Sequence, residues 1–305
     1  MSNIDKKYTS KKMKKRPAKS REYADLLNNF SAFKETYYQI VQDFNFDQQK
    51  DKEAQKYLNR LLEKKGKDWD REKIIHAFHH QIQKKPVICI FGAGPSLESC
   101  INKLIQTSHK NIFKYTINLA ADGGSVFLRK KKIFLDGIFT DLDGITSKEF
   151  RYGTYLIVHA HGDNTEKLRM FKEEIRKKHK IIGTGQVKAE HLIINPGGFT
   201  DGDRIIFFLK NLLLPSQKIC FFGMDFGSSV GKYSKSEFHT DKKANKIKKK
   251  KLHYARLLIK RVIDEIPNQC YFVEPKKRLE EFSAITIEDF IKLVKKSKEY
   301  TLNQD

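Results

Sequence analysis

The sequence is poor in cysteine, and its four cysteines form no CxxC pair. A zinc ribbon and a disulfide framework both need clustered or paired cysteines, so this spacing argues against both kinds of fold. Cys89 and Cys220 lie inside short apolar runs, where a free thiol behaves as a small buried hydrophobic side chain. The cysteine pattern therefore indicates a reducing compartment.

Long apolar stretches are also missing. No run of about 18 apolar residues occurs, so the sequence predicts no transmembrane helix and no membrane partner. The first 20 residues are rich in lysine but lack the apolar core of a signal peptide, so we expect a cytoplasmic protein. At 305 residues, the chain is long enough for one large α/β domain with a smaller unit beside it.

Acidic residues are outnumbered by basic ones, and the formal net charge is +23. The basic excess is concentrated in three segments: residues 1–20 carry eight Lys or Arg, residues 129–132 carry four and residues 242–251 carry seven. Such runs in tails and loops are usually solvated or disordered. Contact with nucleic acid through these segments is left open, as a role secondary to another function.

The periodicity of apolar residues divides the chain into four segments. We expect a disordered basic tail at residues 1–20, a small helical unit at 21–85, a catalytic α/β domain at 86–275 and a helical C-terminal extension at 276–305. Apolar residues at helical spacing, such as Leu26, Phe30 and Phe33, support the assignment of the second segment.

From residue 86 onward, short apolar runs alternate with charged, helical segments. We expect strands at 87–91, 115–119, 137–140, 155–160, 180–182, 191–194, 218–223 and 270–273, and helices between them at 97–105, 126–131, 166–179, 203–213 and 244–266. This alternation predicts βαβ units and hence a Rossmann-like, mainly parallel sheet flanked by helices. Ligands bind at the carboxyl ends of the strands in such a sheet.

Two acidic motifs follow predicted strands, namely Asp122-Gly123-Gly124 and Asp141-Leu142-Asp143-Gly144. Mg²⁺ prefers oxygen ligands and usually takes one or two carboxylates together with substrate phosphates. Because Asp141 and Asp143 are two residues apart, both reach one ion only if the strand bends or ends there, which Gly144 favours. A solvated turn would be an equal explanation of the second motif if it stood alone.

Further aspartates follow other predicted strands. Asp163 comes after the strand at 155–160, Asp201 and Asp203 follow a pair of glycines, and Asp225 follows the strand at 218–223. A single aspartate in such a place is commonly a helix cap. Five strand ends that carry both glycine and aspartate instead predict one shared site for metal-bound phosphates, with Arg204 or a loop lysine to neutralise charge.

The turn Gly92-Ala93-Gly94-Pro95-Ser96 closes the first predicted strand and opens a helix. Glycines let the backbone approach a phosphate, and the amides at a helix start supply hydrogen-bond donors. The turn lacks the third glycine of GxGxxG, however, and no GxxxxGK[ST] motif occurs in the sequence. A tight strand-to-helix turn explains these glycines equally well.

Together, these motifs resemble the archaeal 6-hydroxymethyl-7,8-dihydropterin diphosphokinase family, the MptE-like proteins. The resemblance extends from about residue 37 to residue 273, and its pieces occur in the family's order: 92–97, 121–123, 140–144, 159–164, 197–204 and 223–227. The motifs at Asp122 and Asp141 also resemble those of thiamin diphosphokinases. Leu135 and Pro196 depart from the family pattern, but only in loops.

The resemblance implies Mg²⁺-dependent transfer of a diphosphoryl group from ATP to the hydroxymethyl oxygen of the dihydropterin, with release of AMP. On this reading Asp141 and Asp143 hold Mg²⁺, and Asp122 and Asp163 complete the catalytic carboxylates. The residues expected to meet nucleotide or pterin are Gly92, Gly94, Pro95, Ser96, Gly123, His161, Asn164, Phe199, Thr200, Asp201, Asp203, Arg204 and Asp225. Among these, Asp201 and Phe199 are expected to hold the pterin ring.

Two other functions remain open at this point. One is thiamin diphosphokinase or another nucleotide-dependent transferase on the same scaffold, which would differ in the acceptor. The other is a basic nucleic-acid-binding protein without enzymatic activity, although converging carboxylates repel phosphates unless a metal is present. The sequence does not decide the oligomeric state, with a homodimer as one option, or whether the product serves folate or a methanopterin-type coenzyme.

Overall fold

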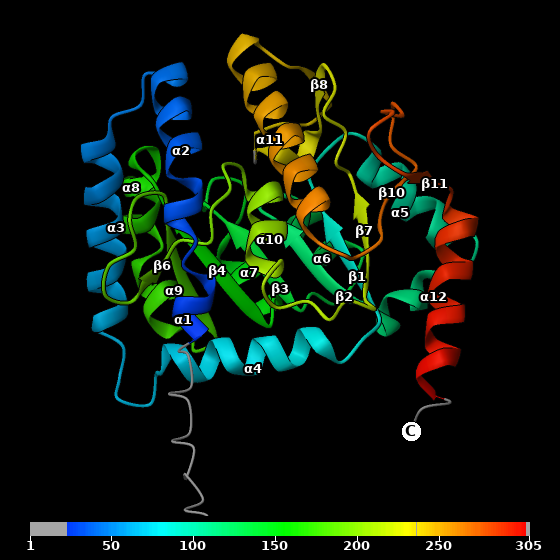
Figure 1. Ribbon diagram of the computed structural model, residues 1–305, viewed down its shortest axis with the longest axis horizontal. Coiled ribbons are helices and arrows are strands. Elements are labelled where there is room, and N and C mark those ends of the chain that lie inside the picture. The colour runs from blue at the N-terminus through cyan, green and yellow to red at the C-terminus, as the bar shows by residue number, and fades with distance from the viewer. Residues whose placement is uncertain (1–22, 236, 303–305) are drawn as a thin grey trace, which may run out of the picture.

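The computed structural model describes residues 23–235 and 237–302, and their central element is a nine-stranded sheet (Figure 1). The strand order is β11-β10-β7-β1-β2-β3-β4-β5-β6, and every neighbouring pair is parallel. Helices flank this sheet, so the predicted Rossmann-like α/β fold is confirmed. The predicted basic tail at residues 1–20 lies outside the described residues.

All eight predicted strands are present, although some bounds shift by up to three residues. The strands of the sheet are β1 Val87–Phe91, β2 Ile117–Ala121, β3 Gly137–Thr140, β4 Tyr155–Ala160, β5 Ile181–Gly185, β6 Ile193–Ile194, β7 Lys218–Phe222, β10 Cys270–Val273 and β11 Ala284–Ile285. A separate antiparallel pair is formed by β8 Ser229–Val230 and β9 Lys242–Lys243. The sequence missed β8, β9 and β11, each of which has only two residues.

The helices are α1 Tyr23–Leu27, α2 Phe30–Phe44, α3 Gln48–Glu63, α4 Arg71–Gln83, α5 Ser96–Gln106, α6 Gly124–Lys130, α7 Ser147–Tyr152, α8 Thr165–Met170, α9 Lys172–Lys177, α10 Asp201–Leu209, α11 Lys246–Glu265 and α12 Ile287–Leu302. The single helix expected at 166–179 was wrong, because Phe171 separates α8 from α9. The sequence also missed α7, which begins at a capping box formed by Thr146 and Glu149. Within the described residues, no helix is both long and apolar enough to cross a membrane.

Both faces of the sheet are covered, so consecutive strand residues pack into different hydrophobic clusters. In β1, Ile88 and Ile90 face α4, α10 and α11, whereas Cys89 and Phe91 face α5, α6 and α12. Apolar residues on both faces of a strand are the mark of a buried parallel sheet. Cys89 and Cys220 are buried, as predicted, and Cys100 and Cys270 are buried as well; all four are free thiols.

The helices α1 to α4 lie along the sheet and contribute to its two hydrophobic clusters. Phe78 of α4, for example, stacks on Tyr155 of β4 with ring centroids 4.3 Å apart. The predicted boundary between a helical unit at 21–85 and a catalytic domain at 86–275 concerns which parts fold independently. This boundary stays a prediction.

The order of the strands creates a crevice beside β1. From β1 the chain builds the sheet outward in one direction through β2 to β6, and then crosses back to place β7 on the other side of β1. At such a switch point the connections leave the carboxyl ends of neighbouring strands in opposite directions, which opens a space for ligands. The loops that follow β1 and β7 meet at this point.

Candidate active site

Three aspartates from separate elements come together at the carboxyl edge of the sheet. Asp122 follows β2, Asp141 follows β3 and Asp201 is the first residue of α10. One carboxylate oxygen from each lies within 4.8 Å of those from the other two, and no other such group of potential metal ligands was found among the described residues. We call Asp122, Asp141 and Asp201 the aspartate trio.

The backbone beside the trio adopts conformations that L-residues rarely take. Asp122 has φ +37° and Leu142 has φ +74°, both in the left-handed region. Thr140 ties the two turns together, because its Oγ1 donates to Asp122 Oδ1 (2.6 Å) and accepts from the Leu142 amide (2.7 Å). Strained residues of this kind cluster at functional sites, where the surrounding structure fixes them.

The three carboxylates have different electrostatic environments. Burial, together with the charge of Asp141, raises the pKa of Asp122 to about 7. Burial and the charges of Asp141 and Asp122 also raise the pKa of Asp201 well above its ordinary value. Burial acts in the same direction on Asp141, but the hydrogen bonds from His161 and the Asp143 amide, together with the charge of Arg204, outweigh it and lower the pKa of Asp141 to about 2.

These carboxylates form a suitable donor set for Mg²⁺. All the donors are oxygens, which a hard divalent cation prefers, and the mutual repulsion that raises the pKa of Asp122 and Asp201 would be relieved by a cation between them. The residues present therefore fit the metal that the sequence predicted.

Asp143 does not belong to this group. Its amide donates to Asp141 Oδ1 (3.1 Å), and its half-exposed carboxylate lies 3.9 Å from Lys167 Nζ and 4.0 Å from Lys235 Nζ. Asp143 therefore shapes the turn that carries Asp141. The geometry favours Asp122 and Asp201 over Asp143 as the metal-binding partners of Asp141.

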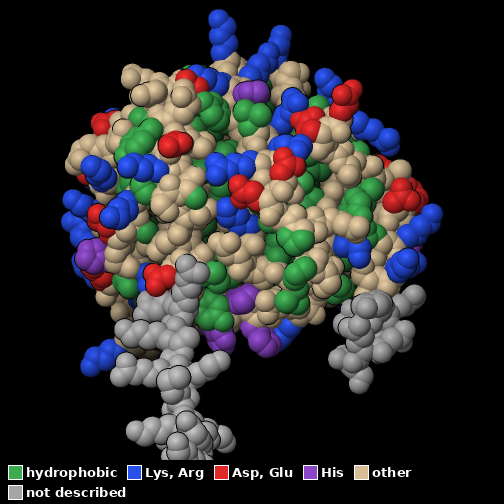
Figure 2. Space-filling model, in the orientation of Figure 1, with side chains coloured by type: hydrophobic (Ala, Val, Ile, Leu, Met, Phe, Trp, Pro, Cys, Tyr) green, Lys and Arg blue, Asp and Glu red, His purple; other side chains and the backbone are tan. Residues whose placement is uncertain are grey.

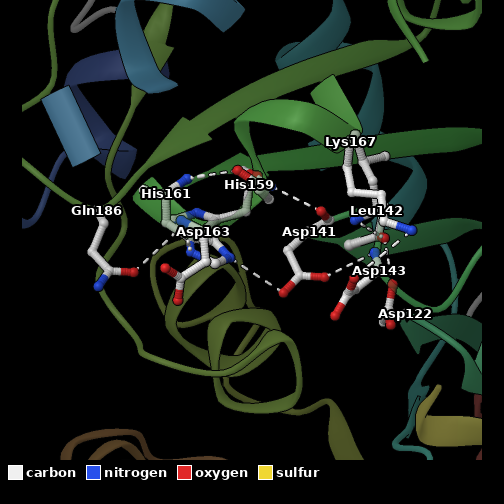
Figure 3. A network of polar contacts seen from close by, with 12 residues as sticks. Asp122, Asp141, Leu142, Asp143, His159, His161, Asp163, Lys167 and Gln186 are labelled. Carbon is white, nitrogen blue, oxygen red and sulfur yellow. Dashed lines mark hydrogen bonds and ion pairs between the residues drawn. The ribbon is translucent and has the colours of Figure 1, made fainter. Parts of the chain in front are cut away.

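The turn after β4 holds Asp141 from the other side (Figure 3). His161 Nδ1 accepts from the Asp163 amide (3.3 Å), which leaves the proton on Nε2 to be donated to Asp141 Oδ2 (3.3 Å). Asn164 donates to the carbonyls of Asp141 (2.8 Å) and His159 (2.7 Å). His161 and Asn164 thus position Asp141, whereas the Asp163 side chain is exposed at the rim of a pocket.

Two pockets meet at Asp201 of the trio. The first, of about 240 Å³, is lined by Asp51, Phe46, Phe199, Arg204 and Lys251, and we call it the polar pocket. The second, of about 140 Å³, lies at the crevice between β1 and β7, and we call it the switch pocket. Thr200, Asp201 and Lys248 line both pockets. Ligands in the two pockets would therefore both reach the Asp201 carboxylate.

The glycine turn after β1 forms part of the switch pocket, but its amides are mostly used within the protein. Gly92 and Gly94 donate to the carbonyls of Phe222 and Gly223 (both 2.8 Å), and a Cβ on Gly94 would lie 2.4 Å from the Gly223 oxygen. These glycines therefore permit close packing of two loops, and their contact with a substrate stays a prediction.

Asp225 is another residue that was expected to meet nucleotide or pterin, and its carboxylate binds backbone amides of the protein. Its Oδ2 accepts from the Ser96 amide (2.7 Å) at the start of α5, and its Oδ1 accepts from the Lys276 amide (2.9 Å). Asp225 thus caps α5, which is the common role of a single aspartate after a strand. Pro95 precedes Ser96 at this helix start, and Gly123 occupies the matching place before α6.

Asp203 and Arg204 are buried and engaged with the protein itself. Asp203 accepts from the amide (2.9 Å) and the hydroxyl (2.6 Å) of Thr200 and also from the Phe199 amide. Arg204 is only 7% exposed and donates to the Phe199 carbonyl (2.6 Å) and to Gln186 Oε1 (2.9 Å). Both side chains therefore build the wall between the pockets, and Arg204 has little freedom to follow a phosphate.

Comparison with known proteins identifies this architecture. A family model described as 6-hydroxymethylpterin diphosphokinase MptE-like matches residues 62–231. A Methanocaldococcus jannaschii protein named 6-hydroxymethyl-7,8-dihydropterin pyrophosphokinase is 38% identical over 240 residues, which cover 75% of this chain and 94% of the relative. Proteins of the same name from Methanothermobacter thermautotrophicus and Pyrococcus furiosus are each 33% identical, and 90% and 91% of their lengths are covered.

The chain belongs to the MptE-like family. The resemblance stated from the motifs is thereby confirmed. The MptE-like match contains the whole aspartate trio, the glycine turn after β1 and the turn after β4. It ends before α11, which carries Lys248 and Lys251, and it begins after most of α3, which carries Asp51.

Asp51 is a site residue that the sequence interpretation missed. It lies on the buried face of α3 with Ala54 and Leu58, so a carboxylate interrupts an otherwise apolar stripe, and this interruption was the available signal. Its Oδ1 accepts from the Gly162 amide (2.8 Å) and its Oδ2 from the Tyr37 hydroxyl (2.9 Å). Asp51 thereby fixes the His161 turn of this MptE-like protein to its first helices.

We expect Tyr37→Phe to lower the free energy of unfolding by about 1–3 kcal/mol, because the buried Asp51 carboxylate would lose a hydrogen-bond donor that water cannot easily replace. Urea unfolding followed by circular dichroism measures this change. Tyr38→Phe is the matched control, since Tyr38 is 38% exposed and Tyr37 only 1%. Equal stabilities of the two variants would contradict the importance of this contact.

Proposed function

We propose that this protein is a 6-hydroxymethyl-7,8-dihydropterin diphosphokinase that uses ATP and Mg²⁺. In the proposed reaction the hydroxymethyl oxygen attacks the β-phosphorus of ATP, the bond from that phosphorus to the α,β-bridging oxygen breaks, and AMP leaves as the hydroxyl proton is released. The aspartate trio, whose Asp201 lies where two pockets meet, is the observation that carries this proposal in an MptE-like chain.

The carboxylates of Asp122, Asp141 and Asp201 would hold Mg²⁺, and the bound ion would neutralise charge on the phosphates. His161 keeps Asp141 ionised and oriented, and Thr140 orients Asp122. No side chain needs to act as a strong base, since phosphoryl transfer depends mainly on positioning and charge neutralisation.

The two pockets offer one place for each substrate. Phe46 and Phe199 line the polar pocket, where an aromatic ring system such as a pterin can stack. The role of Asp201 as acceptor for the pterin edge competes with its place in the trio, and we propose the metal role for it.

The four free, buried thiols support a cytoplasmic location.

The decisive experiment measures AMP formation from ATP with 6-hydroxymethyl-7,8-dihydropterin and, in parallel, with thiamin. We expect pterin-dependent AMP that is abolished by EDTA and restored by added Mg²⁺, because the trio repels phosphates when no cation lies between them. AMP with thiamin alone would assign a different acceptor. No AMP with either acceptor at saturating Mg²⁺ would refute the proposed function.

A further inference from the structure

The lysine-rich segment at 242–251 was expected as a charged loop, but its residues from 244 onward also belonged to the helix predicted at 244–266, and that helix is confirmed as α11. Asn245 caps α11 by accepting from the Lys248 amide (2.8 Å), so the helix begins within the run of lysines. Figure 2 shows basic side chains gathered at the top of the molecule, where α11 begins in Figure 1. The loop interpretation therefore fails for residues 246–251, which are helical.

The lysines of this helix point in different directions. Lys246 and Lys249 are exposed, whereas Lys248 and Lys251 are half-buried and line the polar pocket. The same face continues with Leu252 into the switch pocket, as the i, i+3, i+4 spacing of a helix requires. One face of α11 thus covers the place where the two pockets join.

Lys248 is half-buried like Lys250 and Lys251, but unlike them it has no partner of its own. Lys250 pairs with Asp43 at 3.3 Å, and Lys251 Nζ lies 5.5 Å from the centre of the Phe46 ring. The ammonium of Lys248 makes no hydrogen bond and no ion pair within the part of the chain that the structure describes. A half-buried cation without a partner is unfavourable unless a ligand supplies one.

The position of Lys248 indicates what that ligand is. Lys248 lines both pockets, and its charge interacts with those of Asp201, Asp141 and Asp122 without contact to any of them. The space between a lysine and three carboxylates suits a group that is anionic toward the lysine and bound to metal on its other side. A phosphate chain coordinated to Mg²⁺ has this character.

We propose that Lys248 binds the phosphate chain that is transferred between the two pockets, opposite the aspartate trio. This inference rests on the proposed function, which assigns ATP to the site. A lysine here would neutralise negative charge on the phosphates during transfer, a part that Arg204 cannot readily take because its guanidinium is bound within the wall.

The test compares Lys248→Met with Lys249→Met, which removes an exposed lysine from the same turn of α11. We expect Lys248→Met to lower kcat for AMP formation by about 10²–10³-fold, as the loss of one preorganised charge-stabilising donor does, with partial recovery in Lys248→Arg. Lys249→Met should stay within about twofold of the wild type, because surface substitutions away from such a site are usually close to neutral.

Two binding measurements, made by calorimetry on the full chain, separate this role from a structural one. Lys248→Met should weaken binding of inorganic triphosphate at least about tenfold, which is about 1.4 kcal/mol, and leave Mn²⁺ affinity unchanged or tighter. If Lys248 only balances the aspartates, Mn²⁺ binding tightens while triphosphate binding and kcat stay at the level of Lys249→Met, and the inference is overturned. An inactive wild type would instead count against the proposed function.

Discussion

Asp141→Asn is expected to lower pterin-dependent AMP formation by about 10³-fold or more, while Asp143→Asn stays within about fivefold of the wild type. Asp141 belongs to the aspartate trio and is kept ionised by His161, whereas Asp143 faces Lys167 and Lys235 beside it. The two residues are two positions apart in one turn, so their variants differ only in which carboxylate is lost. Initial rates at saturating ATP and Mg²⁺ measure the contrast.

Asp201→Asn provides an independent check on the same site. The pKa of Asp201 is raised in the folded protein, so ionising its carboxyl at neutral pH costs folding free energy. Replacing the carboxyl by a neutral amide should raise Tm in the absence of metal and still abolish activity, because an uncharged amide oxygen is a much weaker ligand for Mg²⁺ than a carboxylate. A variant that is inactive because it is unfolded would show the opposite change in Tm.

The outcome for Asp143 decides between two metal sites. If Asp143→Asn were as inactive as Asp141→Asn, and Asp201→Asn remained active, then the ion would lie between Asp141 and Asp143. Asp122, Asp141 and Asp201 would then lie close together because of the fold and not because they bind a metal together.

Gly144→Ala is the second substitution for which we expect a large effect. A Cβ at this position would lie 2.2 Å from Asp122 Oδ2 and 2.9 Å from the Gly123 nitrogen, so the carboxylate has to leave its place. Its hydrogen bond with Thr140 would be lost at the same time. Because a misplacement of about 1 Å at a reacting centre costs roughly 10²-fold in rate, we expect a loss of that size in kcat.

Mn²⁺ titration of Gly144→Ala, read by calorimetry, should show weakened binding together with the lower rate. Gly66→Ala is the control, since a Cβ at Gly66 would meet nothing within 4 Å and the residue has no positive φ. Normal metal affinity in Gly144→Ala would show that Asp122 is not a ligand.

The sequence was sufficient for the order of the strands along the chain and for the edge of the sheet at which the site lies. Continuous apolar runs, such as residues 155–160, identified the strands. Parallel strands bring their carboxyl ends to one edge of the sheet. The motifs at Asp122 and Asp141 also carried the family resemblance, because each combines glycine with aspartate at a strand end.

The sequence could not decide which of the many aspartates share a site. Asp141 and Asp143 look equivalent in a sequence, yet the positive φ of Leu142 between them turns their carboxylates to different surroundings. Asp201, Asp203 and Asp225 likewise look alike, but the last two accept hydrogen bonds from backbone amides, while Asp201 lies beside Asp122 and Asp141. An aspartate that caps a helix and one that binds a metal differ in where the side chain points. That direction depends on backbone angles, which a sequence does not show.

The parts of the site that come from distant segments depended entirely on tertiary structure. Asp51 reaches Gly162 across 111 positions of the chain, and Lys248 covers both pockets only because α11 packs against α10. The local pattern of apolar residues was enough to show that these residues are helical and which strands are buried, because both properties depend on near neighbours in the sequence. Packing between the elements decided which side chains meet, because it is set by the whole core at once.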